Sequence, residues 1–377
     1  MQVVGIVCEY NPFHNGHAKQ LAAIDGAAVC LMSGNYVQRG EPALLDRLVR
    51  AEAAVRCGAA LVLELPVTYA LRSAEGFAAG GMELMDRLGC IDAICFGTES
   101  GDTRGLMETA KTLLDPAFSP FLKAQLARGL SFPAARARAL AAMGADAALL
   151  ERPNDILGVE YCKALLARGS AIRPLPIRRE GAYHGGSEPA NPSASYLRSC
   201  ADWRGFVPAA ALACCADAPR YTVAAGERAW LARLRAMEEA DFAALPYGSE
   251  GLWRKVMHAC RTRGTLGEIV GAAKSKRYTH TRLMRMLLCA FLGISAALLE
   301  QPAPYVRILA MDDRGRRLLR QMHETSSIPL LHPGQTPPEG AYAALERRAA
   351  DLYGLFREGT VAAPGRREQI RYCPPAD

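Results

Sequence analysis

Two histidines stand one helical turn apart just after the first apolar run of the chain. The run is Val3–Cys8, and an H-x-G-H motif follows it with His14, Gly16 and His17. In an α/β sheet, ligands bind at the carboxyl edge of the strands, and the free N–H groups that open the next helix favour a phosphate. Both imidazoles can donate to one triphosphate, and Gly16 lacks the Cβ that would block its approach. The spacing predicts chemistry at an α-phosphate, with the histidines stabilising the charge that develops there.

A second candidate phosphate-binding segment, Pro192–Arg198, opens a helix after the last expected strand. Ser193 and Ser195 can cap this helix, and Arg198 lies on the same side as Ser195, three residues further on. Taken alone, the segment is typical of an ordinary serine-capped helix. Paired with H-x-G-H, it resembles the element of H-x-G-H nucleotidyltransferases whose Ser/Thr and basic groups hold the β- and γ-phosphates. Ser195 stands where threonine is commoner, which keeps a hydroxyl group.

The first 200 residues alternate short β-branched runs with amphipathic stretches. This alternation predicts an α/β fold with a Rossmann-like, doubly wound parallel sheet, which together with the motif indicates the H-x-G-H nucleotidyltransferase type. The expected strands are Val3–Cys8, Ala28–Met32, Leu61–Leu65, Ala93–Phe96 and Ile172–Ile177. The expected helices between them are Gly16–Ile24, Asp46–Cys57, Ser73–Leu88 and Asp102–Leu114. A further helical block, Phe118–Met143 and Asp155–Arg168, is expected to be an insertion over the strand ends and a candidate lid.

After about residue 205 the strand signals fade, and we expect a mainly α-helical domain. Its expected helices are Glu227–Ala244, Leu252–Arg263, Leu266–Ala273, Thr281–Leu292 and Tyr342–Arg357. The expected domains are therefore residues 1–205, with a helical insertion near 115–170, and residues 206–377.

The formal net charge of +7 is unevenly distributed. Residues 1–200 hold 20 basic and 20 acidic side chains, whereas residues 201–377 hold 25 and 18. Within the second part, nine basic residues of the window Arg254–Arg285 are opposed by Glu268 alone. Such a window is typical of a surface that binds a phosphate backbone, and a solvated helical face is the alternative.

Composition excludes several classes of protein. Half of the residues are hydrophobic and 22% are charged, unlike a disordered, collagen-like or coiled-coil chain. No apolar run approaches the ~18 residues of a membrane span, and Val3–Cys8 does not read as a secretory segment, so we expect a cytoplasmic protein with no membrane partner. None of the twelve cysteines forms a C-x-x-C pair, which favours reduced, mostly buried thiols. No protein-bound metal site is expected.

Several longer segments resemble one family, the tRNA(Met) cytidine acetate ligases. The resemblance runs from residue 1 to about residue 370, and together its motifs are highly specific. The segments that carry it are Glu9–His17, Ser33–Pro42, Leu63–Pro66, Ser73–Glu75, Phe96–Asp102, Arg152–Gly158 and Lys276–Arg282.

The resemblance implies a two-step ligation. Acetate is activated by ATP, accompanied by Mg²⁺, to acetyl-adenylate and pyrophosphate, and the acetyl group then passes to N4 of the wobble cytidine of elongator tRNA(Met), giving N4-acetylcytidine. Acetate is a poor acylating agent until it is joined to AMP as a mixed anhydride. The cytidine amine is a weak nucleophile, so the adenylate must be oriented and shielded from water.

The resemblance also implies site residues. ATP is expected along the segment after the first strand, which comprises Val7, Cys8, Glu9, Tyr10, Asn11, Pro12, Phe13, His14, Asn15, Gly16, His17, Ala18, Lys19 and Gln20. His14 and His17 are the expected catalytic donors. Gly101, Asn154 and the pair Arg178–Arg179 resemble further nucleotide contacts, with a turn glycine, a helix N-cap and surface arginines as the alternatives; which arginine faces the nucleotide stays open. The expected tRNA surface comprises Arg254, Lys255, Lys274, Lys276, Arg277, Arg282 and Arg285.

Some residues keep two interpretations. Arg50 either reaches a phosphate or pairs with Asp46 on a helix surface, and Glu9 either orients acetate or a water or binds backbone amides. His184 and His280 fit loop and RNA-facing positions better than metal ligation. Two rival functions remain open: an adenylyltransferase acting on a small phosphorylated metabolite, and a non-catalytic tRNA-binding adaptor.

Overall fold

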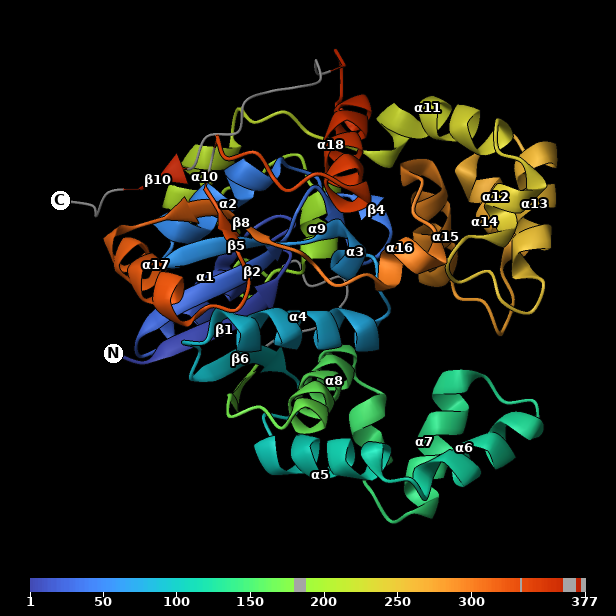
Figure 1. Ribbon diagram of the computed structural model, residues 1–377, viewed down its shortest axis with the longest axis horizontal. Helices are drawn as coiled ribbons and strands as arrows, with labels where there is room; N and C mark the ends of the chain where they lie inside the picture. The colour runs from blue at the N-terminus through green and yellow to red at the C-terminus, as the bar shows by residue number, and fades with distance from the viewer. Residues whose placement is uncertain (180–187, 333, 362–370, 374–377) are drawn as a thin grey trace.

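A central eight-stranded sheet organises the computed structural model, which describes residues 1–179, 188–332, 334–361 and 371–373 (Figure 1). The strand order is β10-β8-β5-β2-β1-β6-β7, and β9 pairs with β8. The parallel strands are β1 (Val3–Cys8), β2 (Ala27–Ser33), β5 (Leu61–Leu65), β6 (Ala93–Thr98) and β7 (Arg173–Arg178). All five predicted strands and the doubly wound fold are thereby confirmed.

The strand order reverses between β1 and β6. From β1 the chain moves outward through β2 and β5, and it then returns to place β6 and β7 on the other side of β1. At such a switch point the connections leave in opposite directions, which opens a crevice beyond the carboxyl ends of the two strands. The H-x-G-H motif follows β1 and Gly101 follows β6, so both border this crevice.

Helices cover both faces of the sheet. On one face lie α4 (Ala74–Leu88), α8 (Pro153–Arg168) and α17 (Asp313–Thr325). On the other lie α1 (Asn15–Ala22), α2 (Arg47–Arg56), α9 (Ala194–Ser199) and α10 (Ala209–Cys215). The side chains of β1 point alternately into the two layers: Val3 packs into the first and Val4 into the second. Burial on both faces explains why these strands read as continuous apolar runs.

Three strands occur where fading strand signals were expected, so that prediction is wrong at this edge of the sheet. Strand β8 (Val306–Met311) lies antiparallel to β5, and β9 (Leu330–Leu331) and β10 (Arg371–Tyr372) pair with it in parallel. The sheet can accept an antiparallel strand here because β5 would otherwise leave an unpaired edge. The division at residues 205 and 206 stays a prediction.

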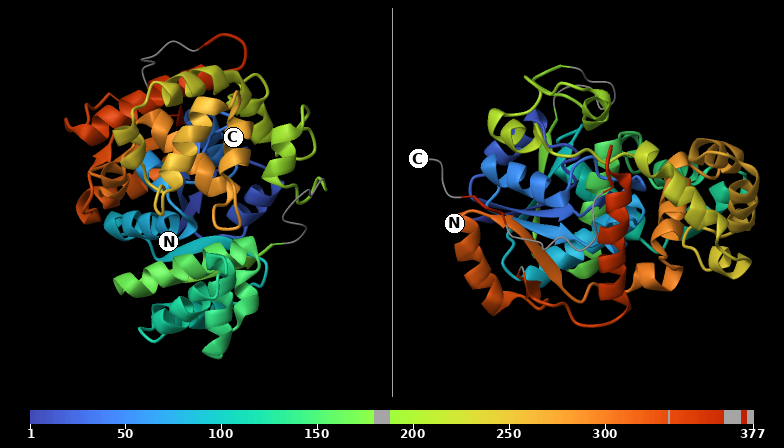
Figure 2. Two further views of the ribbon diagram at one scale, coloured as in Figure 1. Left: turned by 90° about the vertical axis from the view of Figure 1, so that its right-hand side faces the viewer. Right: turned by 90° about the horizontal axis from the view of Figure 1, so that it is seen from above.

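The helical part packs around its own core beside the sheet (Figures 1 and 2). Its aromatic centre is Trp230, Phe291 and Phe356, and Trp230 Nε1 donates to the carbonyl of Leu287 at 2.9 Å. The expected helix Glu227–Ala244 is two helices, because Glu238 begins a new one with a capping box. The elements are α11 (Val223–Arg235), α12 (Glu239–Ala243), α13 (Leu252–Thr262), α14 (Leu266–Ala273), α15 (His280–Leu292), α16 (Ala296–Glu300), α18 (Ala341–Tyr353) and the 3₁₀ helix η2 (Gly354–Phe356).

The predicted helical insertion divides into two parts. Helix α8 packs on the sheet against α4 and connects β6 to β7, so it belongs to the layered fold. The helices that project are α6 (Phe118–Ala127) and α7 (Phe132–Ala142), which share a small core with the end of α5 (Thr103–Leu114) and the 3₁₀ helix η1 (Ala147–Leu150) (Figure 1). A lid role for this projection stays a prediction.

A short hairpin joins the sheet to the helical part. Its strands are β3 (Tyr36–Val37) and β4 (Glu41–Pro42), and the four-residue helix α3 (Val67–Ala70) lies nearby. The Tyr36 hydroxyl donates to the carbonyl of Ala349 in α18 at 2.9 Å. In the other direction, the Tyr353 hydroxyl of α18 donates to the carbonyl of Ala43 at 2.8 Å. Gly40, at φ +82°, lies against the backbone of α15, where an added Cβ would come within 2.4 Å of the Arg285 nitrogen. Close approach of two backbones is therefore the reason for glycine at this position.

We expect Gly40→Ala to lower the free energy of unfolding by several kcal/mol, because the methyl group collides with backbone that cannot rotate away. Gly129→Ala is the matched control: Gly129 has φ +80° but nothing within 4 Å of the added Cβ, so it should lose only about 1 kcal/mol. Chemical denaturation of both variants measures the difference. Equal losses would show that backbone strain, and not contact with α15, requires the glycine.

Candidate active site

His14 and His17 are held by the backbone of the helix that they open. His14 is the N-cap of α1, and its Nδ1 accepts from the Gly16 N–H at 3.1 Å. The His14 N–H in turn donates to Nδ1 of His17 at 3.3 Å, which completes a capping box. Because both Nδ1 atoms accept, the proton of each neutral ring must lie on Nε2. The cap thereby fixes which nitrogen of each ring can donate to a ligand.

The two rings form a compact aromatic unit. Their centroids lie 3.6 Å apart with an interplanar angle of 22°. The rings of Tyr10 and Phe13 flank His17 at 4.8 and 5.6 Å. Both flanking rings are buried, so they restrict the imidazole to one orientation.

Burial keeps both histidines uncharged. It lowers the pKa of His14 to about 3, and the positive charge of Arg179 acts in the same direction. Burial, the neighbouring His14 ring and Arg179 together lower the pKa of His17 well below its ordinary value. At neutral pH the site therefore offers two oriented Nε2–H dipoles, the kind of preorganised donor that stabilises developing charge.

The second predicted phosphate-binding segment meets the turn between β1 and α1. Arg198 donates from Nη1 to the carbonyl of Asn11 at 3.0 Å and from Nη2 to Ser195 Oγ at 3.2 Å. The Asn11 side chain accepts from the Leu44 N–H at 2.7 Å, and a cis bond joins Asn11 to Pro12. The structure thus brings both predicted phosphate elements to one place. Ser193 is buried and caps α9 through the Tyr196 N–H at 3.1 Å.

Asn154 and Gly101 lie on the opposite side of the crevice. Asn154 lies in the first turn of α8, whose N-cap is Arg152, so the interpretation of Asn154 as an N-cap is wrong. Gly101 has φ +69°, and its N–H donates to Thr98 Oγ1 at 2.9 Å. The left-handed conformation favours glycine here.

The structure separates the two arginines that the sequence could not. Arg179 extends β7, with its N–H donating to the carbonyl of Thr98 at 2.8 Å and its Nη1 to Asn154 Oδ1 at 3.4 Å. Its charge also acts on both histidines. Arg178 is exposed, and its side chain runs beside Gly101. Arg179 is therefore the arginine that lies near the histidine pair.

Arg50 is fully buried, so neither interpretation made from the sequence is correct. Its guanidinium donates to the carbonyls of Leu45, Glu9 and Ser33 at 2.9, 2.5 and 3.1 Å, and also to that of Gly34. Asp46 instead caps α2, and Arg47 pairs with Glu64 at 2.5 Å. The sequence contains no signal that the Arg50 side chain would donate to carbonyls at the ends of strands.

Glu9 accepts the N–H of Gln38, in the hairpin, at 2.7 Å, and burial raises the pKa of its carboxyl. The interpretation in which it binds a backbone amide is thus confirmed for one oxygen.

Other members of the segment after β1 have structural contacts. Asn15 Nδ2 donates to the carbonyls of Pro189 and Gly205 at 2.8 and 2.9 Å, and Lys19 Nζ donates to Asn191 at 2.8 Å. Gln20 Nε2 lies 3.5 Å from the Cys95 carbonyl. The side chains of Val7, Cys8 and Ala18 pack against the two cores of the sheet. These contacts hold the α9 segment beside α1.

The expected tRNA surface is mostly exposed, with two exceptions. Arg282 is half-buried and donates to the Tyr247 carbonyl at 2.9 Å and to Ser249 Oγ at 3.0 Å. Arg285 is buried, lies over the Tyr247 ring and donates to the carbonyl of Gln38 at 3.4 Å. The exposed members are Arg254, Lys255, Lys274, Lys276 and Arg277. His280 is exposed in the first turn of α15, and His184 lies outside the described residues.

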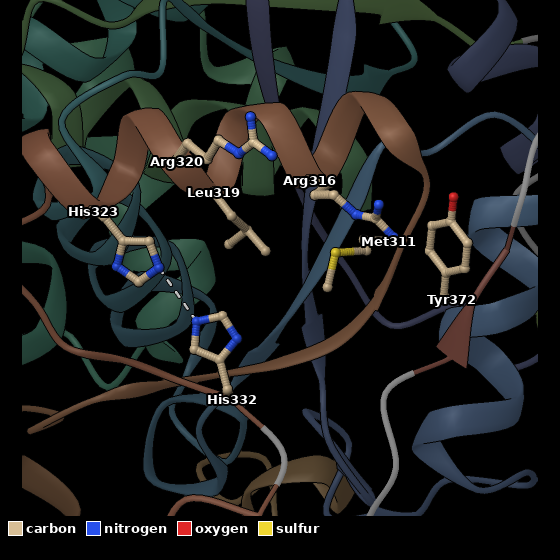
Figure 3. Close-up of a pocket in the computed structure, with 7 residues that line it drawn as sticks. All are labelled: Met311, Arg316, Leu319, Arg320, His323, His332 and Tyr372. Atoms are coloured by element: carbon tan, nitrogen blue, oxygen red, sulfur yellow. Dashed lines mark hydrogen bonds between the residues drawn. The ribbon is translucent and has the colours of Figure 1, made fainter.

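A cavity of about 360 Å³ lies beside α17, and neither His14 nor His17 lines it (Figure 3). It is lined by Arg316, Arg320, His323, His332 and others. The Nε2 atoms of His323 and His332 are 3.3 Å apart. Within the described ranges, no group of three or more His, Cys, Asp or Glu side chains is placed to hold a metal ion. The same ranges contain no helix long and apolar enough to cross a membrane.

Comparison with known proteins supplies the family. A model of the HIGH Nucleotidyl Transferase family matches residues 1–368. A tRNA(Met) cytidine acetate ligase from Clostridium novyi is 36% identical over 358 residues, covering 88% of this chain and 89% of that protein. One from Acetivibrio thermocellus is 36% identical over 369 residues, covering 88% of each. The chain belongs to the tRNA(Met) cytidine acetate ligase family.

Solved structures agree with this assignment. The crystal structure of Thermotoga maritima TmcAL bound with alpha-thio ATP matches with a TM-score of 0.88 at 28% identity, covering 99% of this chain and 100% of that one. The apo structure of the same protein matches with a TM-score of 0.89. The resemblance to tRNA(Met) cytidine acetate ligases and the predicted fold class are both confirmed.

Acidification is expected to destabilise the chain through the histidine pair. Because the folded-state pKa of each ring is lowered, the unfolded chain takes up protons below about pH 6.5 that the folded chain does not. Stability should fall by about 1 kcal/mol per pH unit for each ring as the pH drops below that point. Urea unfolding from pH 7.5 to 4.5 measures this slope, and His14→Asn/His17→Asn should flatten it. Equal slopes for both proteins would contradict the lowered pKa values.

The two arginines should differ in their effect on nucleotide affinity. Arg179→Ala removes the guanidinium beside the histidines and should weaken ATP binding about 10-fold or more, the cost of one charge-assisted contact. Arg178→Ala is the matched control and should change the Kd by less than about 3-fold, because an exposed side chain loses little. Titration calorimetry measures both values. A larger loss for Arg178 would reverse the assignment.

Proposed function

We propose that this chain is an ATP-dependent ligase that joins acetate to N4 of the wobble cytidine of elongator tRNA(Met) through an acetyl-adenylate. The observation that carries the proposal is the pair of neutral imidazoles at the start of α1, each with its donor nitrogen fixed by the backbone. The names of relatives that match over 88% of the chain support acetate and tRNA(Met) as the substrates.

In the first step, a carboxylate oxygen of acetate attacks the α-phosphorus of ATP. A new P–O bond forms, the bond to the bridging oxygen breaks, and pyrophosphate leaves with the electron pair. Negative charge gathers on the α-phosphate oxygens and on the leaving group. His14 and His17 can stabilise this charge through Nε2–H without gaining a proton. Ser195 and Arg198, which lie beside the same turn, support the β- and γ-phosphates, and Mg²⁺ arrives with ATP.

In the second step, N4 of cytidine attacks the carbonyl carbon of the acetyl-adenylate. The C–N bond forms, the C–O bond to the phosphate breaks, AMP leaves, and N4 gives up one proton. Because the amine is a weak nucleophile, the adenylate must survive long enough for an oriented attack. A site that excludes water lengthens that survival by limiting hydrolysis.

The nucleotide is placed along the segment from Val7 to Gln20, with Gly101, Asn154 and Arg179 on the facing side. This placement is supported by the crevice at the switch point between β1 and β6, where doubly wound folds bind ligands. The left-handed Gly101 lets backbone approach closely, and Arg179 brings a positive charge to the histidine pair.

The tRNA is placed on the exposed basic residues of α13 and of the segment between α14 and α15, which are Arg254, Lys255, Lys274, Lys276 and Arg277. Arg254 lies over the ring of Trp253 with 4.5 Å between its Cζ and the ring centroid, and Arg282 lies over Tyr278 at 5.2 Å. Charge beside aromatic rings suits RNA, because phosphates and unstacked bases can be bound together. Arg285 is left out of this surface because it is buried against the hairpin.

The proposal is tested by incubating the chain with radiolabelled acetate and elongator tRNA(Met), with and without ATP, followed by nucleoside analysis. Label should appear in N4-acetylcytidine only with ATP. His17→Ala should lower the rate about 100-fold or more, because one preorganised donor is lost. His323→Ala, an exposed histidine on α17, is the matched control and should keep the rate.

Other outcomes would identify the rival functions. Exchange of pyrophosphate with phosphorylated metabolites, without labelled tRNA, would indicate an adenylyltransferase. Retained tRNA binding with neither activity would indicate an adaptor.

A further inference from the structure

Glu99, a residue with no role so far, joins the end of β6 to the start of α8. It follows β6, and its carboxylate faces the start of α8. Oε1 accepts from the backbone N–H and from Nδ2 of Asn154 at 3.3 and 2.7 Å, and Oε2 accepts from the N–H of Asp155 at 2.9 Å. One carboxylate thus caps a helix and also binds a side chain that belongs to the proposed nucleotide site.

The Asp155 side chain also binds the end of β6, through contacts that do not involve the Glu99 side chain. It is fully buried, and its Oδ1 accepts from the N–H groups of Glu99 and Ser100, each at 3.1 Å, and from Ser100 Oγ at 2.9 Å. The junction of β6 with α8 is therefore held from both sides. Because Asp155 fixes the backbone, the bond from Asn154 Nδ2 to Glu99 is left to orient a side chain.

That bond determines which way the Asn154 amide points. A carboxylate only accepts, so Nδ2 must face Glu99, and Oδ1 is left to face Arg179. A guanidinium only donates, and Arg179 Nη1 lies 3.4 Å from that oxygen. The chemistry of both neighbours therefore requires the same orientation of the amide. Glu99, Asn154 and Arg179 form a line of hydrogen bonds that ends beside His14 and His17.

We propose that Glu99 is a positioning residue for ATP, which orients Asn154 and through it Arg179. The inference rests on the proposed role of Asn154 and Arg179 as nucleotide contacts. It predicts a specific failure in Glu99→Gln. When the glutamine nitrogen faces Asn154, the Asn154 amide rotates and presents Nδ2 to the guanidinium. Two donors then face each other, and Arg179 loses its acceptor.

A double-mutant cycle on the full chain tests this proposal, with ATP affinity measured by titration calorimetry so that neither acetate nor tRNA is needed. Glu99→Gln and Asn154→Ala should each weaken ATP binding about 10-fold, the cost of one hydrogen bond to a charged group. The double variant should bind no more weakly than Asn154→Ala alone, because Glu99 acts through Asn154. Ser100→Ala, which removes a bond to Asp155 in the same junction, should lower the Tm and leave the ATP Kd within about 2-fold.

The outcomes separate this inference from the proposed function. Multiplied losses in the double variant would show that Glu99 does not act through Asn154, and an unchanged Kd in Glu99→Gln would equally overturn the inference. Absence of ATP binding in the wild-type chain would overturn the proposed function. If Glu99→Gln does not fold, Glu99→Asp replaces it: it keeps the charge near α8, withdraws the carboxylate from Asn154, and should show the same coupling.

Discussion

A buried guanidinium holds together the strand ends on which the site is built. Arg50 is wholly enclosed, and its acceptors are the carbonyls of Leu45, Glu9, Ser33 and Gly34. Burying such a charge costs free energy unless its donors find acceptors, and here backbone dipoles provide them. The bonds join the ends of β1 and β2 to the loop before α2. The turn that carries the histidines and the hairpin toward the helical part both begin at these strand ends, so their geometry depends on this one side chain.

The site favours neutral donors over charged ones. The backbone uses Nδ1 of each histidine as an acceptor, and burial with a nearby guanidinium removes the second proton. A pair of imidazolium ions would attract a triphosphate more strongly in its ground state, whereas fixed dipoles gain most from charge that appears during the reaction. The cap at the start of α1 thus leaves the Nε2–H of each histidine as the donor that can reach a ligand in the crevice beyond β1 and β6.

The sequence identified what local pattern determines. Five parallel strands, the helices on both faces and the H-x-G-H motif all have signals within a few neighbouring residues, and the structure contains them. Strand β8 was missed because Val306–Met311 is one short apolar run among helical patterns, and its partner β5 lies far away in the chain. Arg50, Arg285 and Arg179 were unresolved for a related reason. A charge pattern gives no indication of which basic side chains become buried, and here carbonyls from distant segments surround Arg50 and Arg285.

The path of the chain between sheet and helical part fixes the distance between them. The chain enters the helical part after α10, leaves it for β8, and returns with α18, while Tyr36 and Tyr353 bond across the junction. A domain tied by one linker can swing, but one crossed several times and bonded to a hairpin has no free hinge axis. The separation between the basic surface and the histidine pair is consequently fixed. An RNA bound to the basic surface, as proposed above, therefore reaches the crevice only with a nucleotide at that separation from the bound backbone.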